Sequence, residues 1–150
     1  MDKAIYFDMD GTIANLYGVK DWLPKLQASN PSPYEQAKPL CNMQALARLL
    51  NGLQKKGYNI GIVSWLSKNG TKEYNEQVIK AKRKWLDKHL KSVNFDEINI
   101  GKHGTPKSTM VKHMQGILFD DEIDNRKHWQ GQAFPPENIF EELKYLSKNA

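Results

Sequence analysis

Two aspartates near the N-terminus have the spacing and the setting of a catalytic or metal-binding pair. Asp8 and Asp10 follow the apolar run Ala4-Ile5-Tyr6-Phe7 and precede Gly11 and Thr12. The run has the length and the aromatic, β-branched character of a buried strand, and glycine permits a sharp turn after it. Two carboxylates held close together repel each other unless a cation or a shared proton offsets their charge. Because Mg²⁺ prefers oxygen ligands, the pair predicts a magnesium site.

A second pair of acids follows another apolar run. Gly116-Ile117-Leu118-Phe119 leads directly into Asp120 and Asp121. The alternative is a helix N-terminus, where the helix dipole favours negative charge. That alternative suits Glu122 and Asp124 better than it suits two aspartates at the tip of a strand. The sequence thus predicts paired acids at the end of a buried strand for a second time.

Lys82 has an unusual position for a charged side chain. At about 100° per residue it falls in the middle of the apolar face of a helix predicted over residues 71–90. A lysine on a core face is unfavourable unless it is paired, and a cluster of aspartates would pair it. The alternative is that its side chain reaches water at the edge of that face. The neighbouring basic residues fall on the opposite face: Lys80, Arg83, Lys84, Lys88 and Lys91.

The elements that must position these residues alternate along the chain. Besides the first strand, apolar runs predict strands over 58–63, 97–100 and 116–119. Helical spacing predicts helices over 42–57, 71–90 and 136–146. Residues 14–40 are irregular and rich in proline, with a short helix over 19–27 and turn chemistry over 29–33. Strands that alternate with helices predict an α/β fold with a parallel sheet covered on both faces, and 150 residues make one domain.

The composition limits the class of protein and its partners. Charged residues make up 26% and hydrophobic ones 39%, as in ordinary globular domains, and no apolar run approaches a membrane span. Acids at Asp2, Asp8 and Asp10 argue against a signal peptide. Cys41 is the single cysteine, which excludes an intrachain disulfide and favours the cytoplasm. The net charge of +5 favours a nucleotide or nucleic acid, although much of it lies within 80–91.

The segment Asp8-Met9-Asp10-Gly11-Thr12 after a hydrophobic strand resembles the first signature of the haloacid dehalogenase superfamily. The resemblance spans nearly the whole chain, 1–150, and implies a Rossmann-like three-layer α/β/α fold with a parallel sheet. It also implies a Mg²⁺-dependent phosphatase. In that chemistry Asp8 would be the nucleophile that forms an aspartyl-phosphate. Asp10 would be the general acid and base and, through its backbone carbonyl, a metal ligand.

The same resemblance implies the other catalytic positions. Ser64, at the end of the second strand, matches the hydroxyl that hydrogen-bonds the transferring phosphoryl group. Asp121 would ligate Mg²⁺ directly, with Asp120 as a water-mediated or positioning partner. A lysine must also steady the nucleophile and the phosphate, and both Lys82 and Lys107 are candidates.

A narrower resemblance favours Lys82 over Lys107. The segment 82–88, followed by a strand, is similar to a helix of the 5′(3′)-deoxyribonucleotidases, a family in which this helix supplies the lysine. This similarity covers roughly residues 58–125. Two features depart from it, because Glu122 stands where the family has arginine and the cap region, 14–40, is much shorter. We therefore expect a minimal cap and a partly open site.

Together the two resemblances imply a hydrolase acting on (deoxy)nucleoside monophosphates. Tyr17, Trp22 or Trp65 would stack on the base, and Thr12 would also contact the substrate. One alternative is a phosphatase for nucleic-acid ends, supported by the open site and the basic helix face. Another is a non-catalytic binding domain, against which the complete set of motif residues argues. His103, His113 and His128 are expected at the surface, and the sequence does not determine the oligomeric state.

Overall fold

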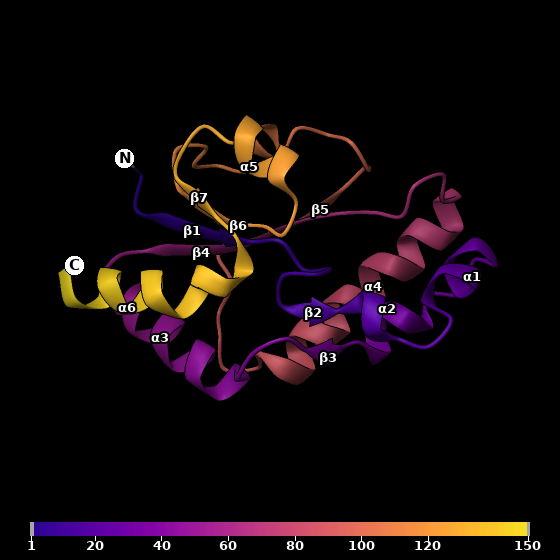
Figure 1. Ribbon diagram of the computed structural model, residues 1–150, viewed down its shortest axis with the longest axis horizontal. Helices are drawn as coiled ribbons and strands as arrows, with labels where there is room; N and C mark the ends of the chain where they lie inside the picture. The colour runs from indigo at the N-terminus through magenta and orange to yellow at the C-terminus, as the bar shows by residue number, and fades with distance from the viewer. Residues whose placement is uncertain (1, 150) are drawn as a thin grey trace.

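Strand β1 (Ala4–Phe7) lies at the centre of a parallel sheet (Figure 1). The computed structural model describes residues 2–149, and within them the sheet has five strands in the order β5-β4-β1-β6-β7. All of its pairings are parallel, which confirms the predicted α/β sheet. The sequence does not predict β7, because a two-residue strand carries no periodicity. The other four strands are β4 (Asn59–Trp65), β5 (Glu97–Gly101), β6 (Ile117–Phe119) and β7 (Ala133–Phe134).

Both faces of β1 are buried, as its uninterrupted apolar run predicts. Ile5 and Phe7 belong to the main core on one face, which helices α3 (Met43–Lys55) and α6 (Ile139–Asn149) cover. The alternate residues of β1 face a smaller cluster that includes Trp129. Figure 1 shows α3 and α6 on one side of the sheet and the short helix α5 (Ile123–His128) on the other. The chain therefore forms the three layers that the sequence predicts.

The long helices begin where their capping residues predict. The side chain of Asn42 accepts a hydrogen bond from the backbone N–H of Ala45 at the start of α3. Thr71 does the same for Tyr74 at the start of α4 (Lys72–His89), which follows β4. The predicted last helix divides into a 3₁₀ turn, Pro136–Asn138, and then α6.

Residues 14–40 fold into short elements beside α4 (Figure 1). Strands β2 (Ala14–Asn15) and β3 (Lys38–Pro39) pair antiparallel and join the two ends of this segment. Between them lie α1 (Trp22–Gln27), which begins later than the predicted helix over 19–27, and α2 (Ser32–Gln36). The predicted turn over 29–33 leads into α2, since proline is tolerated in the first turn of a helix. Helix α2 packs against α4.

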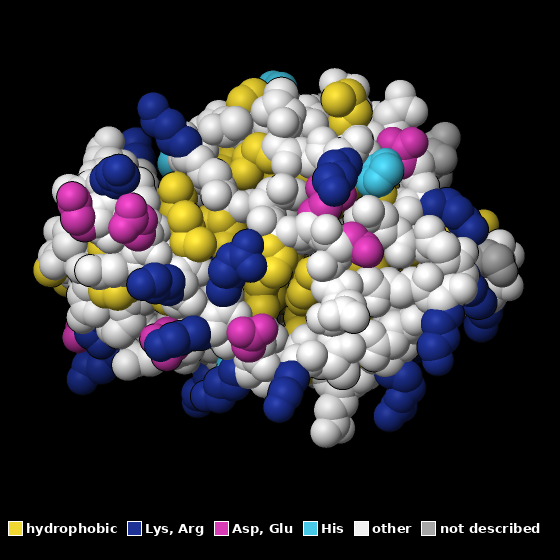
Figure 2. Space-filling model, turned by 180° about the vertical axis from the view of Figure 1, so that it is seen from behind, with side chains coloured by type: hydrophobic (Ala, Val, Ile, Leu, Met, Phe, Trp, Pro, Cys, Tyr) yellow, Lys and Arg dark blue, Asp and Glu magenta, His cyan; other side chains and the backbone are white. Residues whose placement is uncertain are grey.

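Charged side chains surround a hydrophobic hollow on one face of the molecule. Figure 2 shows hydrophobic side chains gathered in the middle of this face, with most lysines and arginines toward its outline. Among residues 2–149, no helix is both long and apolar enough to cross a membrane.

Candidate active site

The turn after β1 places Asp8 and Asp10 at the carboxyl end of the central strand. The backbone N–H groups of Thr12, Ile13 and Ala14 all donate to the carbonyl oxygen of Met9, at 2.9–3.1 Å. Gly11 has a φ of +81°, which side chains rarely allow. A Cβ atom there would lie 2.4 Å from Oδ2 of Asp121. The turn therefore requires glycine both for its backbone conformation and for the close approach of the second acidic segment.

Three carboxylates meet at this edge of the sheet. Oxygen atoms of Asp8, Asp120 and Asp121 all lie within 4.8 Å of one another, and Asp8 and Asp120 are buried. The hydroxyl of Thr12 links two of them, since it donates to Oδ2 of Asp8 (3.0 Å) and accepts from the backbone N–H of Asp121 (3.1 Å). Asp8 of the first acidic pair thus forms one cluster with both aspartates of the second pair, joined by the buried Thr12.

Lys107 provides a positive charge inside this cluster. Its Nζ lies 2.9 Å from Oδ1 of Asp8 and 2.6 Å from Oδ2 of Asp120. The side chain is buried and comes from a 3₁₀ turn, Lys107–Thr109. Asp120 also accepts hydrogen bonds from the side chain of Asn125 (3.2 Å) and the backbone N–H of Glu122 (2.9 Å). Asp120 is therefore engaged mainly by protein donors.

The cluster still carries more negative charge than Lys107 can offset, since it sets three carboxylates against one ammonium group. Burial and the charge of Asp8 raise the pKa of Asp120 to about 6 and that of Asp121 to about 7. Burial lowers the pKa of Lys107, but Asp8 and Asp120 outweigh this effect and raise it. Protons or a cation are thus bound favourably here.

Lys82 occupies a second position in the site, next to Asp10. Its Nζ lies 3.0 Å from Oδ2 of Asp10, 2.7 Å from Oγ of Ser64 and 2.7 Å from the carbonyl oxygen of Trp65. The residue is fully buried, so its side chain does not reach water at the edge of α4. Burial raises the pKa of Asp10, and Asp8 adds to this rise while Lys82 opposes it. Strand β4 continues to Trp65, so Ser64 lies within the strand rather than at its end.

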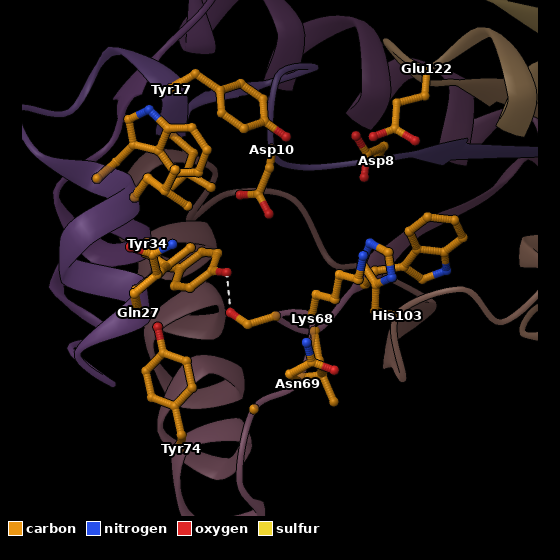
Figure 3. A pocket seen from close by; sticks show the side chains of 18 of the residues that line it. Asp8, Asp10, Tyr17, Gln27, Tyr34, Lys68, Asn69, Tyr74, His103 and Glu122 are labelled. Carbon is orange, nitrogen blue, oxygen red and sulfur yellow. Dashed lines mark hydrogen bonds between the residues drawn. The ribbon is translucent and has the colours of Figure 1, made fainter.

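A cavity of about 550 Å³ opens beside the carboxylates (Figure 3). Tyr17, Tyr34 and Tyr74 line one side of it, and Lys68 and His103 lie across from them. Asp8 and Asp10 lie at one end in this view. Lys107 is among the lining residues of the described chain, whereas Lys82 is not. The rest of the lining comes from the segment 14–40, from the end of β4 and the loop after it, and from the chain after β6. These residues are Leu16, Trp22, Leu23, Leu26, Gln27, Ser29, Trp65, Leu66, Ser67, Asn69, Gly70, Glu122 and Asn125.

The predicted substrate contacts have different places in this cavity. Trp22 lines it and packs edge-on against Tyr17, with ring centroids 4.9 Å apart. Trp65 lines it too, donates to the carbonyl oxygen of Thr105 (2.8 Å) and packs against His103. His103 is exposed, as expected, yet it borders the cavity. Thr12 is buried between carboxylates and is not among the lining residues.

Several cavity residues are not evident from the sequence. Tyr34 lies in the proline-rich segment, where no periodicity marks a side chain as buried. Tyr74 belongs to the predicted apolar face of α4, so the pattern indicates its burial but not its contact with a cavity. Both contributions depend on the packing of α2 against α4. Asn125, which hydrogen-bonds Asp120, lies one turn after the acidic pair, and that spacing is the only signal for it.

Comparison with solved structures supports the fold. The chain is similar to the crystal structure of D,D-heptose 1,7-bisphosphate phosphatase from B. bronchiseptica complexed with magnesium and phosphate. The TM-score is 0.62 at 15% sequence identity, and the alignment covers 100% of both chains. This likeness confirms the Rossmann-like α/β fold with a parallel sheet that we predict from the sequence. No family model matches the chain, and no curated protein matches it either.

Proposed function

We propose that this protein is a Mg²⁺-dependent phosphomonoester hydrolase that works through an aspartyl-phosphate. One observation carries the proposal: Asp8, Asp120 and Asp121 converge with Lys107 at the carboxyl end of the central strand. The fold adds support, because the similar solved structure is a phosphatase crystallised with magnesium and phosphate. The cluster also borders a cavity large enough for a small phosphorylated molecule.

The donors of the cluster fit Mg²⁺. Every side-chain ligand is a carboxylate oxygen, which is the type that Mg²⁺ prefers. Asp8, Asp121 and the backbone carbonyl of Asp10 would hold the ion, and Asp120 would position the site through its bond to Lys107. When bound, the ion would neutralise negative charge on the phosphate and the carboxylates.

The chain's own residues can perform both chemical steps. In the first, the Asp8 carboxylate attacks phosphorus, the bond from phosphorus to the ester oxygen breaks, and Asp10 gives its proton to the leaving alkoxide. In the second, Asp10 takes a proton from water, which attacks phosphorus and releases Asp8 and inorganic phosphate. Lys107 contacts Asp8 and lines the cavity, so it can steady both the nucleophile and the phosphoryl oxygens.

A nucleoside monophosphate is the substrate class that the cavity favours. Tyr17, Trp22, Tyr34 and Trp65 offer aromatic faces and edges on which a flat base can pack. The basic face of α4 favours the alternative, a phosphate at a nucleic-acid end. However, in the described part of the chain the basic residues of that face do not line the cavity. They are Lys80, Arg83, Lys84, Lys88 and Lys91. The position of the basic face therefore favours the monomer.

The test is phosphate release from deoxynucleoside 5′- and 3′-monophosphates and from a 3′-phosphorylated oligonucleotide, with Mg²⁺ and with EDTA. We expect Mg²⁺-dependent release, faster from the monomers. Asp8→Asn is the matched control, because it keeps the shape of the side chain and removes the nucleophile. It should abolish release while circular dichroism shows a folded protein. Equal release by Asp8→Asn would contradict the mechanism, and faster release from the oligonucleotide would favour an end-processing enzyme.

A further inference from the structure

The two buried lysines of the site make different kinds of contact. The ammonium group of Lys82 has three N–H bonds, and it has three acceptors: Asp10, Ser64 and the carbonyl of Trp65. Lys107 has two carboxylate acceptors, and its Nζ also lies over the ring of Trp65, 5.3 Å from the centroid. Lys107 borders the cavity, whereas Lys82 is not among its lining residues. Because its three N–H bonds meet three protein acceptors, the ammonium group of Lys82 has no donor left for a ligand.

We propose that Lys82 is a positioning residue that fixes the carboxylate of Asp10 and the hydroxyl of Ser64, and that it does not bind the phosphoryl group. The assignment rests on the proposed phosphatase function. A group that binds the phosphoryl oxygens must present a free donor to the cavity. Lys107 meets that requirement better, because it contacts the nucleophile and lines the cavity.

Lys82 is itself held firmly enough to position its partners. Its neighbours Val78, Ala81 and Trp85 on α4 are buried, so the helix is anchored at this point. Its Nζ also lies over the ring of Tyr34, 5.0 Å from the centroid. Within residues 2–149, the hydrogen bond to the Asp10 carboxylate comes from the ammonium group of Lys82. A proton donor must be held close to its productive geometry, and displacement by about 1 Å can cost about 10²-fold in rate.

This role predicts a dependence on the leaving group. An alkoxide needs a proton as it leaves, whereas 4-nitrophenolate leaves without one at neutral pH. Loss of a correctly placed Asp10 therefore slows the first step for a nucleotide but hardly for 4-nitrophenyl phosphate. The second step is the same for both esters, because water must lose a proton to Asp10 in each case. With the aryl ester, an enzyme that lacks this positioning would accumulate aspartyl-phosphate.

The experiment compares Lys82→Met with Asp10→Asn and Lys107→Met, on a deoxynucleoside 5′-monophosphate and on 4-nitrophenyl phosphate. For Lys82→Met and Asp10→Asn we expect kcat/KM to fall by about 10²–10⁴-fold on the nucleotide and by less than about tenfold on the aryl ester. On the aryl ester, kcat and KM should fall together. Stopped-flow absorbance should then show a burst of about one equivalent of 4-nitrophenolate. Lys107→Met should slow both esters without a burst.

Other outcomes would overturn the assignment. If Lys82→Met slowed both esters equally without a burst, Lys82 would act on the phosphoryl group; unchanged kinetics would also contradict the proposal. If Lys82→Met failed to fold, the double variant Lys82→Met/Asp10→Asn would replace it, because removing both charges avoids an unpaired buried one. The double variant should have the same kcat/KM values as Asp10→Asn on both esters. Any further loss of kcat/KM on the aryl ester would contradict the positioning role of Lys82. A wild-type protein inactive on both esters would instead contradict the phosphatase function itself.

Discussion

At the scale of single residues, the acidic pairs could be predicted from the sequence, but which aspartate each lysine contacts could not. Asp8, Asp10, Asp120 and Asp121 each follow an apolar run, so their position at strand ends is a local property of the chain. A lysine reaches a carboxylate through a long flexible side chain, and no local pattern fixes its partner. The narrower resemblance favours Lys82 at the nucleophile. In the structure Lys107 contacts Asp8, and Lys82 contacts Asp10.

The carboxyl cluster should make stability depend on pH and Mg²⁺. Burial and Asp8 raise the pKa of Asp120 to about 6 and that of Asp121 to about 7, whereas both titrate near pH 4 in an unfolded chain. The folded state holds these protons more tightly, so their stabilisation is complete below about pH 4. It is lost as pH rises through about 6 to 7. We expect Mg²⁺ to raise Tm more at about pH 8 than at about pH 5.

The measurement is thermal unfolding followed by circular dichroism, in EDTA and in Mg²⁺, at both pH values. Asp121→Asn is the matched control, because it keeps the side-chain shape and removes one titrating group. Its Mg²⁺ shift should be smaller, and its Tm in EDTA should depend less on pH. An equal Mg²⁺ shift at the two pH values in the wild-type protein would contradict the prediction.

Gly11→Ala should weaken both folding and metal binding. The backbone φ of +81° alone disfavours alanine, by about 1–2 kcal/mol. The added Cβ would also lie 2.4 Å from Oδ2 of Asp121, so the acidic segment must move. Gly52→Ala in α3 is the control, because among the described residues no atom outside its own stretch of helix backbone lies within 4 Å of its added Cβ. That substitution should stabilise the protein by about 0.5–1 kcal/mol.

Two measurements check this pair of variants: denaturant unfolding in EDTA, and Mg²⁺ titration followed by calorimetry. We expect weaker Mg²⁺ binding in Gly11→Ala and wild-type binding in Gly52→Ala. Wild-type Mg²⁺ affinity in Gly11→Ala would show that Asp121 does not contribute to the metal site.

At the scale of elements, the sequence predicts the sheet well and the segment 14–40 poorly. The buried strands and the long helices carry strong periodicity and caps, and the structure confirms them with ends shifted by a few residues. Short elements such as α2 and β3 have too few residues for a pattern, and their conformation depends on packing against α4. Much of the cavity wall comes from this segment, so the shape of the cavity was beyond sequence-based prediction.

Helix α2 is joined to the segment after β4 by one hydrogen bond inside the cavity wall. The hydroxyl of Tyr34 lies 2.5 Å from Oγ of Ser67 (Figure 3). Tyr34→Phe removes this bond and keeps the ring, so the wall should become less ordered while the carboxylates stay in place. A hydrogen bond contributes about 0.5–1.5 kcal/mol, and we therefore expect KM for the nucleotide to rise about two- to tenfold with a smaller change in kcat.

Steady-state kinetics on the deoxynucleoside monophosphate test this prediction. Tyr145→Phe in α6 is the control, since Tyr145 is 61% exposed and does not line the cavity. It should leave both constants unchanged. If Tyr34→Phe instead lowered kcat and left KM unchanged, Tyr34 would affect the reacting groups. It would do so through Lys82, whose Nζ lies over the Tyr34 ring.

At the scale of the whole molecule, charge and shape favour different substrates. The net charge of +5 would attract any polyanion. Much of it lies on exposed residues within 80–91, on or just after α4 and outside the cavity, and the lysines and arginines of Figure 2 lie mostly toward the outline. The cavity itself presents Lys68 and Lys107 together with Asp8, Asp10 and Glu122. The charges that attract a polyanion therefore lie apart from the cavity that would bind the phosphate. The dependence of activity on salt concentration distinguishes the two contributions.

We expect kcat/KM for the nucleoside monophosphate to depend only weakly on salt. One phosphate contact gives a change of about three- to fourfold between about 50 and 200 mM salt, whereas 6–10 contacts give about 10³–10⁵-fold. The double variant Lys88→Glu/Lys91→Glu reverses two exposed charges, one in the last turn of α4 and one just after the helix, away from the cavity. It should leave monomer hydrolysis unchanged, with Gly52→Ala as a surface control. A steep salt dependence on an oligonucleotide, abolished by the double variant, would make the basic face a strand-binding surface and the monomer a secondary substrate.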